Sequence, residues 1–243
     1  MKDLNCNSII TEQVASLDMN CDRTQQLKMI EQIIQSGKIG QEALLNFLVD
    51  RCILKKKNVE VLDGLIFEFL YFYSIDDIKQ RLSSYFSFGL IELKSSLQFN
   101  YQPLQDLLIN HDFQQADRLT QSYLCSLANL DQKYNRNWLY FTDIFSLPPE
   151  DLYILDKLWR VYSRDKFGFS IQRKIWLSIN CNWEKLWVNI GWNKNGIPLR
   201  YPSEFIWNIN APDGHLPLFN QLRGVQVIAA LFNHSVWSDN ELV

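Results

Sequence analysis

Apolar residues in the first part of the chain recur at the three- and four-residue spacing of an amphipathic helix. Four such segments follow one another, with apolar stripes at residues 27–34, 43–48, 62–70 and 75–85. Because only short polar connections separate them, successive helices must run antiparallel. The pattern predicts either a small helical bundle or a stacked helical repeat, and no strict internal repeat decides between the two.

A polar stretch without a helical period, residues 93–101, interrupts this pattern. The distribution of two residue types changes at the same place, because all eight Trp and all seven Pro lie at or after Pro103. We therefore predict two domains with different packing, an N-terminal antiparallel bundle at 1–96 and a second helical domain at 97–243.

The second domain carries residues that typically begin a helix. Pro103 suits a first helical turn, and Asp112 with Gln115 three residues later resembles a capping box. Pro149 and Gly168 each precede a further apolar stripe of helical period. Since no segment alternates clearly between apolar and polar residues, the predicted fold class is all-α.

Composition narrows the classes of function. With 24 Lys and Arg against 27 Asp and Glu, the net charge of −3 excludes a broad electrostatic contact with nucleic acid. The five Cys form no C-x-x-C pair, which predicts free thiols in a reducing compartment. The sequence shows neither a secretory signal nor an apolar run that spans a bilayer, so we expect the protein to act in the compartment where it is made.

The familiar catalytic motifs are missing from the sequence. It contains no Gly-rich phosphate loop, no H-E-x-x-H and no G-x-S-x-G. The histidines, His111, His215 and His234, lie far apart, and we interpret them as loop or surface residues rather than metal ligands. The sequence therefore predicts a protein that is not an enzyme and has no metal site.

Aromatic residues instead gather where Gly and Pro break every regular element, between residues 191 and 217. A loop of this length in a compact domain is usually functional. Aromatic side chains such as Tyr201 and Phe205 on it favour an apolar ligand. The alternative is an aromatic core, which is our interpretation for most of the Trp residues.

The helix expected after this loop adds polar groups. Its apolar stripe runs over residues 218–232, while Asn220 and Arg223 lie on a different face. One amide and one cation beside aromatic rings suit a large flat ligand with acidic edges. The alternative is that Arg223 is an ordinary solvated charge.

These residues make a family resemblance visible. The sequence resembles the genomes-uncoupled-four family, porphyrin-binding activators of magnesium chelatase in cyanobacteria and plastids. The matching stretches are DFQQAD at 112–117, WLYFT at 138–142, FGFSIQ at 167–172, IGW at 190–192, APDGHLP at 211–217 and NQLRGV at 220–225. The N-terminal region resembles, by its layout, the helical domain that precedes the core in cyanobacterial members.

The resemblance implies an all-helical, hand-shaped core that binds protoporphyrin IX and Mg-protoporphyrin IX as ligands, with no prosthetic group. Carried over by position, the porphyrin site comprises Phe141, Ile144, Tyr201, Phe205, Asn220, Arg223 and Gln226. It also implies contact with the large, porphyrin-handling subunit of magnesium chelatase, whose metal insertion such a regulatory protein enhances without catalysing it. The implied location is the plastid stroma, or the cytoplasm of a cyanobacterium, and the resemblance allows a peripheral membrane association through the chelatase.

Two departures from the family pattern qualify this expectation. Gln226 stands where the family commonly has a second Arg in the pattern R-G-V-R, and Gln forms no bidentate ion pair. Tyr201 stands where cyanobacterial members have Trp, and Pro198 replaces another aromatic residue. We therefore expect weaker porphyrin binding than in members with both Arg. A pathway scaffold without useful porphyrin affinity and an enzyme acting on a tetrapyrrole are the alternatives.

Overall fold

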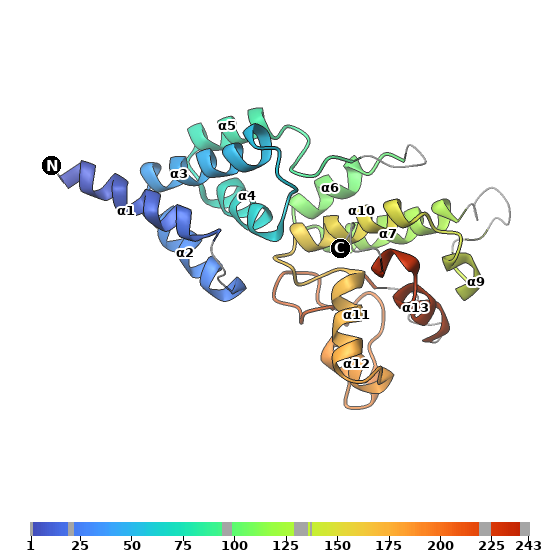
Figure 1. The fold of residues 1–243 in the computed structure, drawn as a ribbon. Coiled ribbons are helices and arrows are strands. Elements are labelled where there is room, and N and C mark those ends of the chain that lie inside the picture. Colours follow the sequence, from blue (N-terminus) through green and yellow to red (C-terminus); the bar gives the residue numbers. More distant parts are fainter. Residues whose placement is uncertain are drawn as a thin grey trace. The chain divides into compact units, whose positions relative to one another are not determined.

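The computed structural model describes residues 2–18, 22–93, 99–128, 136, 138–218 and 225–238. It divides into two compact units (Figure 1), which we call unit 1, Met1–Glu92, and unit 2, Leu93–Val243. Each unit is described by itself.

Unit 1 consists of helices that pack around a central, strongly apolar one. The helices are α1 (Lys2–Ser16), α2 (Arg23–Gln35), α3 (Lys38–Val49), the π-helical turn η1 (Asp50–Leu54), α4 (Val61–Tyr73) and α5 (Asp76–Tyr85). Helix α4 contacts α2, α3 and α5, and its Leu65, Ile66 and Leu70 are fully buried. The four predicted stripes are confirmed as α2 to α5, whereas the sequence reasoning did not predict α1.

An ion-pair cluster ties three segments of unit 1 together. Arg51 in η1 is buried, and its Nε donates to Asp63 Oδ1 at 2.8 Å. Its terminal nitrogens donate to Glu60 Oε2 at 3.1 Å and to Asp18. These carboxylates come from the end of the α1 segment and from the start of α4, so one guanidinium joins both to the end of α3. Such pairing is what allows a cation to be buried.

Unit 2 is also helical. Its elements are α6 (Gln102–Ile109), α7 (Phe113–Leu127), α9 (Phe141–Ile144), α10 (Pro149–Val161), α11 (Phe169–Ser178), α12 (Trp183–Asn189), β1 (Asn193–Lys194), β2 (Ile197–Pro198), α13 (Val225–Phe232) and the 3-10 turn η3 (Ser235–Trp237). Helix α6 packs on α7 and α10, and α11 and α12 extend from them (Figure 1). In the described part of the chain the two-residue strands β1 and β2, which pair antiparallel, are the only sheet, so the all-α prediction is confirmed.

The predicted helix starts are confirmed. The Asp112 side chain accepts a hydrogen bond from Gln115 N at 3.2 Å, as an N-cap residue does. Helix α10 begins at Pro149, and α11 follows Gly168. Gly168 has a φ of 134°, and a Cβ there would lie 2.8 Å from Asp156 Oδ1, so both the backbone and the space require glycine.

Aromatic side chains fill the core where α7 meets α10. The Phe113 and Trp159 rings stack at 6.0 Å, and Phe167 meets Phe113 edge-on at 5.2 Å. Trp159 Nε1 donates to Thr120 Oγ1 at 3.0 Å, which satisfies the polar atom of a fully buried indole. This core fixes α7, the helix that contacts the candidate site.

The described helices include none long and apolar enough to cross a membrane. Among the described residues, no group of three or more His, Cys, Asp or Glu is placed to hold a metal ion.

Candidate functional site

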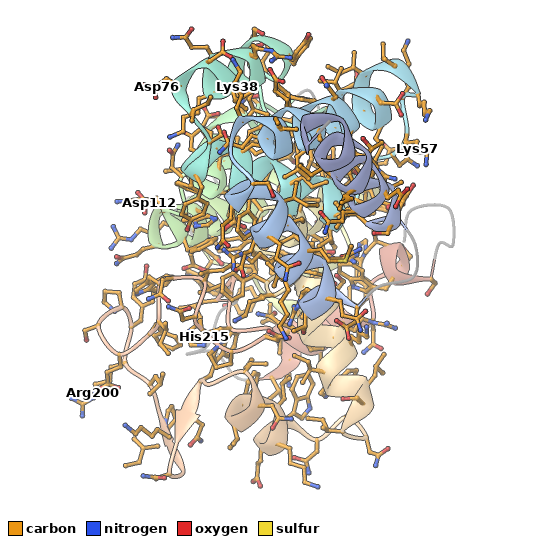
Figure 2. The ribbon with its side chains drawn as sticks, turned by 90° about the vertical axis from the view of Figure 1, so that its left-hand side faces the viewer. Lys38, Lys57, Asp76, Asp112, Arg200 and His215 are labelled. Carbon is orange, nitrogen blue, oxygen red and sulfur yellow. The ribbon has the colours of Figure 1, made fainter. Side chains whose placement is uncertain are left out.

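A buried histidine holds the irregular loop that follows β2. His215 is fully buried, and its Nδ1 lies 2.7 Å from the Ile190 carbonyl while its Nε2 accepts from Ile206 N at 3.1 Å. Because Nε2 accepts, Nδ1 carries the proton and donates to that carbonyl. Burial lowers the pKa of His215, which keeps the ring neutral. Figure 2 shows His215 on the inner side of the loop, while Arg200 points away from the ribbon.

Two histidines therefore differ from the sequence interpretation. His215 does lie in a loop, but neither it nor His234 lies at the surface, because both are buried. His234 also uses both ring nitrogens, toward Leu147 O and Val236 N, each at 3.2 Å. The sequence could not show this, since the carbonyls that stabilise these rings are remote in the chain.

Three aromatic side chains of the loop form one cluster. The Tyr201 ring meets Trp207 edge-on at 6.0 Å, and Phe205 lies 6.2 Å from Trp207 and 5.5 Å from the His215 ring. Trp207 Nε1 donates to the Pro202 carbonyl at 2.9 Å, which fixes the indole. Tyr201 is 44% exposed and Phe205 only 6%, so Tyr201 presents a ring to solvent and Phe205 supports the loop from inside.

Two adjacent residues of α7, Asp117 and Arg118, form hydrogen bonds with the two ends of this loop. On the solvent side, Arg118 Nε donates to Tyr201 Oη at 3.2 Å. On the inner side, buried Asp117 accepts from Leu218 N at 2.6 Å. Burial raises the pKa of Asp117 to about 7, although the Leu218 bond and the Arg118 charge oppose that rise. One helical turn thus positions Tyr201 and the segment that ends at Leu218.

A second group of candidate residues lies on α9 and α13, which pack against each other. Phe141, the first residue of α9, is 44% exposed, whereas Ile144 is fully buried. Gln226 is exposed on α13. The other two predicted site residues, Asn220 and Arg223, lie outside the described residues.

An ion pair between Arg136 and Asp143 stabilises the start of α9. Arg136 Nη2 lies 2.9 and 2.8 Å from the two carboxylate oxygens of Asp143. The same guanidinium lies 4.9 Å from the Trp138 ring and 4.6 Å from the Tyr140 ring, within the range of cation–π contacts. Because Asp143 also accepts from Tyr140 N at 2.6 Å, this pair fixes the start of the helix that carries Phe141.

Several Trp residues belong to the core, as the alternative interpretation held. Trp176, Trp183, Trp187 and Trp192 form a chain of neighbouring rings with centroid distances of 4.9, 5.6 and 5.3 Å. Trp176 and Trp192 are buried, and Trp192 Nε1 donates to the His215 carbonyl at 2.8 Å. This chain of rings supports the loop from behind.

The sequence reasoning missed Arg118 as a neighbour of the site. Its contact with Tyr201 joins residues 83 positions apart. The DFQQAD stretch ends at Asp117 and drew attention to this helix, but it gave no indication of which residues would face the loop.

Family models match nearly the whole chain. The model described as GUN4-like matches residues 94–235, more than half of the chain. A second, described as an ARM-like repeat domain at the GUN4 N-terminus, matches residues 10–87. Of the two arrangements predicted for the N-terminal helices, this description favours the stacked repeat.

Relatives and solved structures agree with these matches. The chain is 45% identical to the Ycf53 protein of Pyropia yezoensis, over 88% of this chain and 90% of that protein. It is 38% identical to a Ycf53-like protein of Synechocystis, with the same coverage. It is 33% identical to the chloroplastic tetrapyrrole-binding protein of Arabidopsis thaliana, over 57% of this chain and 55% of that one. The structure of GUN4 from Chlamydomonas reinhardtii aligns with a TM-score of 0.56 and 37% identity, over 60% of this chain and 95% of that one. The chain belongs to the GUN4-like family.

Proposed function

We propose that this protein binds tetrapyrroles, namely protoporphyrin IX and Mg-protoporphyrin IX, through unit 2. The observation that carries the proposal is the half-exposed Tyr201 ring, held against Trp207 and beside the cation of Arg118. Phe141, Asn220, Arg223 and Gln226 complete the proposed site, and the buried side chains of Ile144 and Phe205 support it from inside. The Arabidopsis relative is a tetrapyrrole-binding protein, which supports the same ligand class.

The chemistry of the ligand suits these side chains. A porphyrin macrocycle is flat and apolar, and each contact with an aromatic ring contributes about 0.5–1.5 kcal/mol beyond the buried area. Its two propionates need donors, and a hydrogen bond to a charged group contributes about 1.5–3 kcal/mol when it is shielded from water. Tyr201 offers the ring, and the guanidinium of Arg118 beside it offers donors.

The state of the buried histidines favours metal-free or magnesium porphyrin over haem. Tight axial ligation of haem iron commonly uses a histidine nitrogen. In His215 and His234 both ring nitrogens are occupied by backbone groups. Neither side chain is available as an axial ligand without breaking those bonds.

We further propose that the protein is a non-catalytic activator of magnesium chelatase. In this role it presents porphyrin to the large subunit of the chelatase, in the plastid stroma or in the cytoplasm of a cyanobacterium. Peripheral association with membranes then occurs through that enzyme. The family resemblance supports this role, as does the engagement of His215 and Asp117 in structural hydrogen bonds rather than in an open catalytic arrangement.

A fluorescence titration tests tetrapyrrole binding. Because every Trp lies at or after Trp138, quenching by deuteroporphyrin IX reports on unit 2 alone. Tyr201→Ala should weaken binding severalfold, whereas Tyr85→Ala, which removes a similarly exposed Tyr from unit 1, should leave it unchanged. Absence of saturable quenching in the unmodified protein would refute the proposal and favour the scaffold alternative.

A reconstituted chelatase assay tests the second part. Adding the protein at low magnesium should raise the rate of Mg-porphyrin formation. Tyr201→Ala should reduce the stimulation at subsaturating porphyrin and Tyr85→Ala should not. An unchanged rate with a protein that binds porphyrin would separate binding from activation and refute only the activator role.

A further inference from the structure

We propose that Arg118 binds a carboxylate of the ligand that stacks on Tyr201, and so adds a propionate contact to the tetrapyrrole site. This inference rests on the proposed function and deepens it. It names the residue of α7 that recognises the acidic edge of the ligand.

The guanidinium of Arg118 lies at the hydroxyl end of the Tyr201 ring. Arg118 Nε donates to Tyr201 Oη at 3.2 Å, although the two residues lie 83 positions apart. Arg118 is exposed, and Tyr201 is 44% exposed. A cation and an aromatic face are therefore held side by side at the surface, at one hydrogen bond's separation.

The Arg118 side chain has more hydrogen-bond donors than its bond to Tyr201 uses. A guanidinium carries five N–H donors, and the Tyr201 bond uses one at Nε. In the described part of the chain, no acceptor bonds the two terminal nitrogens of Arg118. One N–H group of each terminal nitrogen points in the same direction, and this planar pair of donors, the fork, matches the two oxygens of a carboxylate.

The bond to Tyr201 also sets the orientation of the Arg118 guanidinium. The tyrosine bond fixes Nε relative to the ring, so less side-chain entropy is lost when the fork binds an anion. Asp117, the neighbouring carboxylate on α7, faces inward to Leu218 N, where it does not compete for the fork. Arg200 is the neighbour of Tyr201 in sequence, but it points away from the ribbon in Figure 2. Of these two arginines, Arg118 is the one held at the ring.

The Tyr201 ring suits a flat ligand, and the Arg118 cation suits a negatively charged group at the edge of that ligand. A ring bound on Tyr201 alone would need no cation, and an anion bound on Arg118 alone would need no ring. A planar tetrapyrrole that carries propionates satisfies both. The ester of the same macrocycle keeps the ring and loses the anion, so it separates the two contributions.

The test compares deuteroporphyrin IX with its dimethyl ester by Trp quenching. Arg118→Gln should weaken binding of the diacid about three- to tenfold and leave the ester within a factor of two. Arg118→Lys, which keeps the charge but loses the fork, should show an intermediate loss. Arg200→Gln is the matched control, because it removes the same charge from the residue that precedes Tyr201, and it should leave binding of the diacid unchanged.

Three results would overturn the role of Arg118. Equal weakening of diacid and ester by Arg118→Gln and Tyr201→Phe would show that Arg118 only holds the Tyr201 ring. An equal loss of diacid binding in Arg118→Gln and Arg200→Gln would show a general effect of positive charge. An unmodified protein that binds neither probe would overturn the proposed function itself, and this outcome differs from unchanged diacid binding in Arg118→Gln, which overturns only the role of Arg118.

Discussion

Asp117 predicts a pH dependence of stability that belongs to unit 2. Its carboxylate is buried on α7 and accepts one hydrogen bond, from Leu218 N at 2.6 Å. Burial raises its pKa from 3.8 to about 7. The folded protein therefore holds a proton that the unfolded chain releases between about pH 4 and pH 7. Raising the pH through this window destabilises the fold, and above pH 7 the effect levels off.

The magnitude follows from the size of the pKa change. Each pKa unit corresponds to about 1.4 kcal/mol. The contribution of Asp117 to the free energy of unfolding thus falls by at most about 1.4 kcal/mol per pH unit, and by about 4 kcal/mol over the whole window. Asp117→Asn is neutral at every pH, so this dependence should disappear in the variant.

Urea unfolding at pH 5, 6, 7 and 8, followed by Trp fluorescence, measures this effect. All eight Trp lie in unit 2, so the signal reports on that unit. The difference in unfolding free energy between Asp117→Asn and the unmodified protein should shift steadily in favour of the variant from pH 5 to 7. Other titrating groups, including His215 and His234, are present in both proteins and largely cancel in the difference.

A matched substitution on the same helix serves as the control. Asp112→Asn makes the same chemical change at an exposed N-cap, where Asn caps about as well as Asp. Its difference from the unmodified protein should not follow the same pH course. A difference for Asp117→Asn that stays constant from pH 5 to 8 would refute the argument that this carboxylate is buried and protonated near neutrality.

Three further predictions concern other parts of the chain. Gln226→Arg should tighten deuteroporphyrin binding severalfold, because Arg can pair with a propionate; an unchanged dissociation constant would remove residue 226 from the site. Arg51→Met should lower the unfolding free energy of unit 1 by about 3–5 kcal/mol, measured by circular dichroism beside an unchanged Trp fluorescence transition of unit 2, because it removes the cation that pairs with the buried carboxylate of Asp63. Phe205→Ala should destabilise unit 2 by about 3–5 kcal/mol in urea unfolding, whereas Tyr201→Ala should cost much less because its ring is half-exposed; equal losses would contradict their different burial.

The sequence predicted the helices well because their starts and faces depend on local rules. Asp112 caps α7 through a residue three positions away, and Pro149 begins α10 because proline fits a first turn. The apolar stripe at residues 62–70 became α4, the most buried helix of unit 1. Helix α1 was missed, since its residues show only a weak amphipathic period.

The loop was predictable in position but not in conformation. Its Gly and Pro residues indicated irregular backbone, yet its geometry depends on partners that no local pattern shows. Asp117 binds a backbone amide 101 positions away, and Gln172 donates to the carbonyls of Gly214 and Pro217 at 2.9 and 2.8 Å. For the same reason the sequence predicted that His215 lies in the loop but could not show that its partners bury it.

Because of these long-range contacts we expect α7 to affect binding, although the family resemblance assigned it no ligand residue. A site made of loop residues gains affinity when the loop is already ordered before the ligand arrives. Asp117 and Arg118 are adjacent, and they order different ends of the loop, one through a buried backbone bond and one through an exposed side-chain bond. Loss of the Asp117 bond should therefore affect stability first and binding indirectly. Loss of Arg118 should affect binding while stability hardly changes, because an exposed hydrogen bond contributes little to folding. The two variants thus separate the order of the loop from its contact with the ligand.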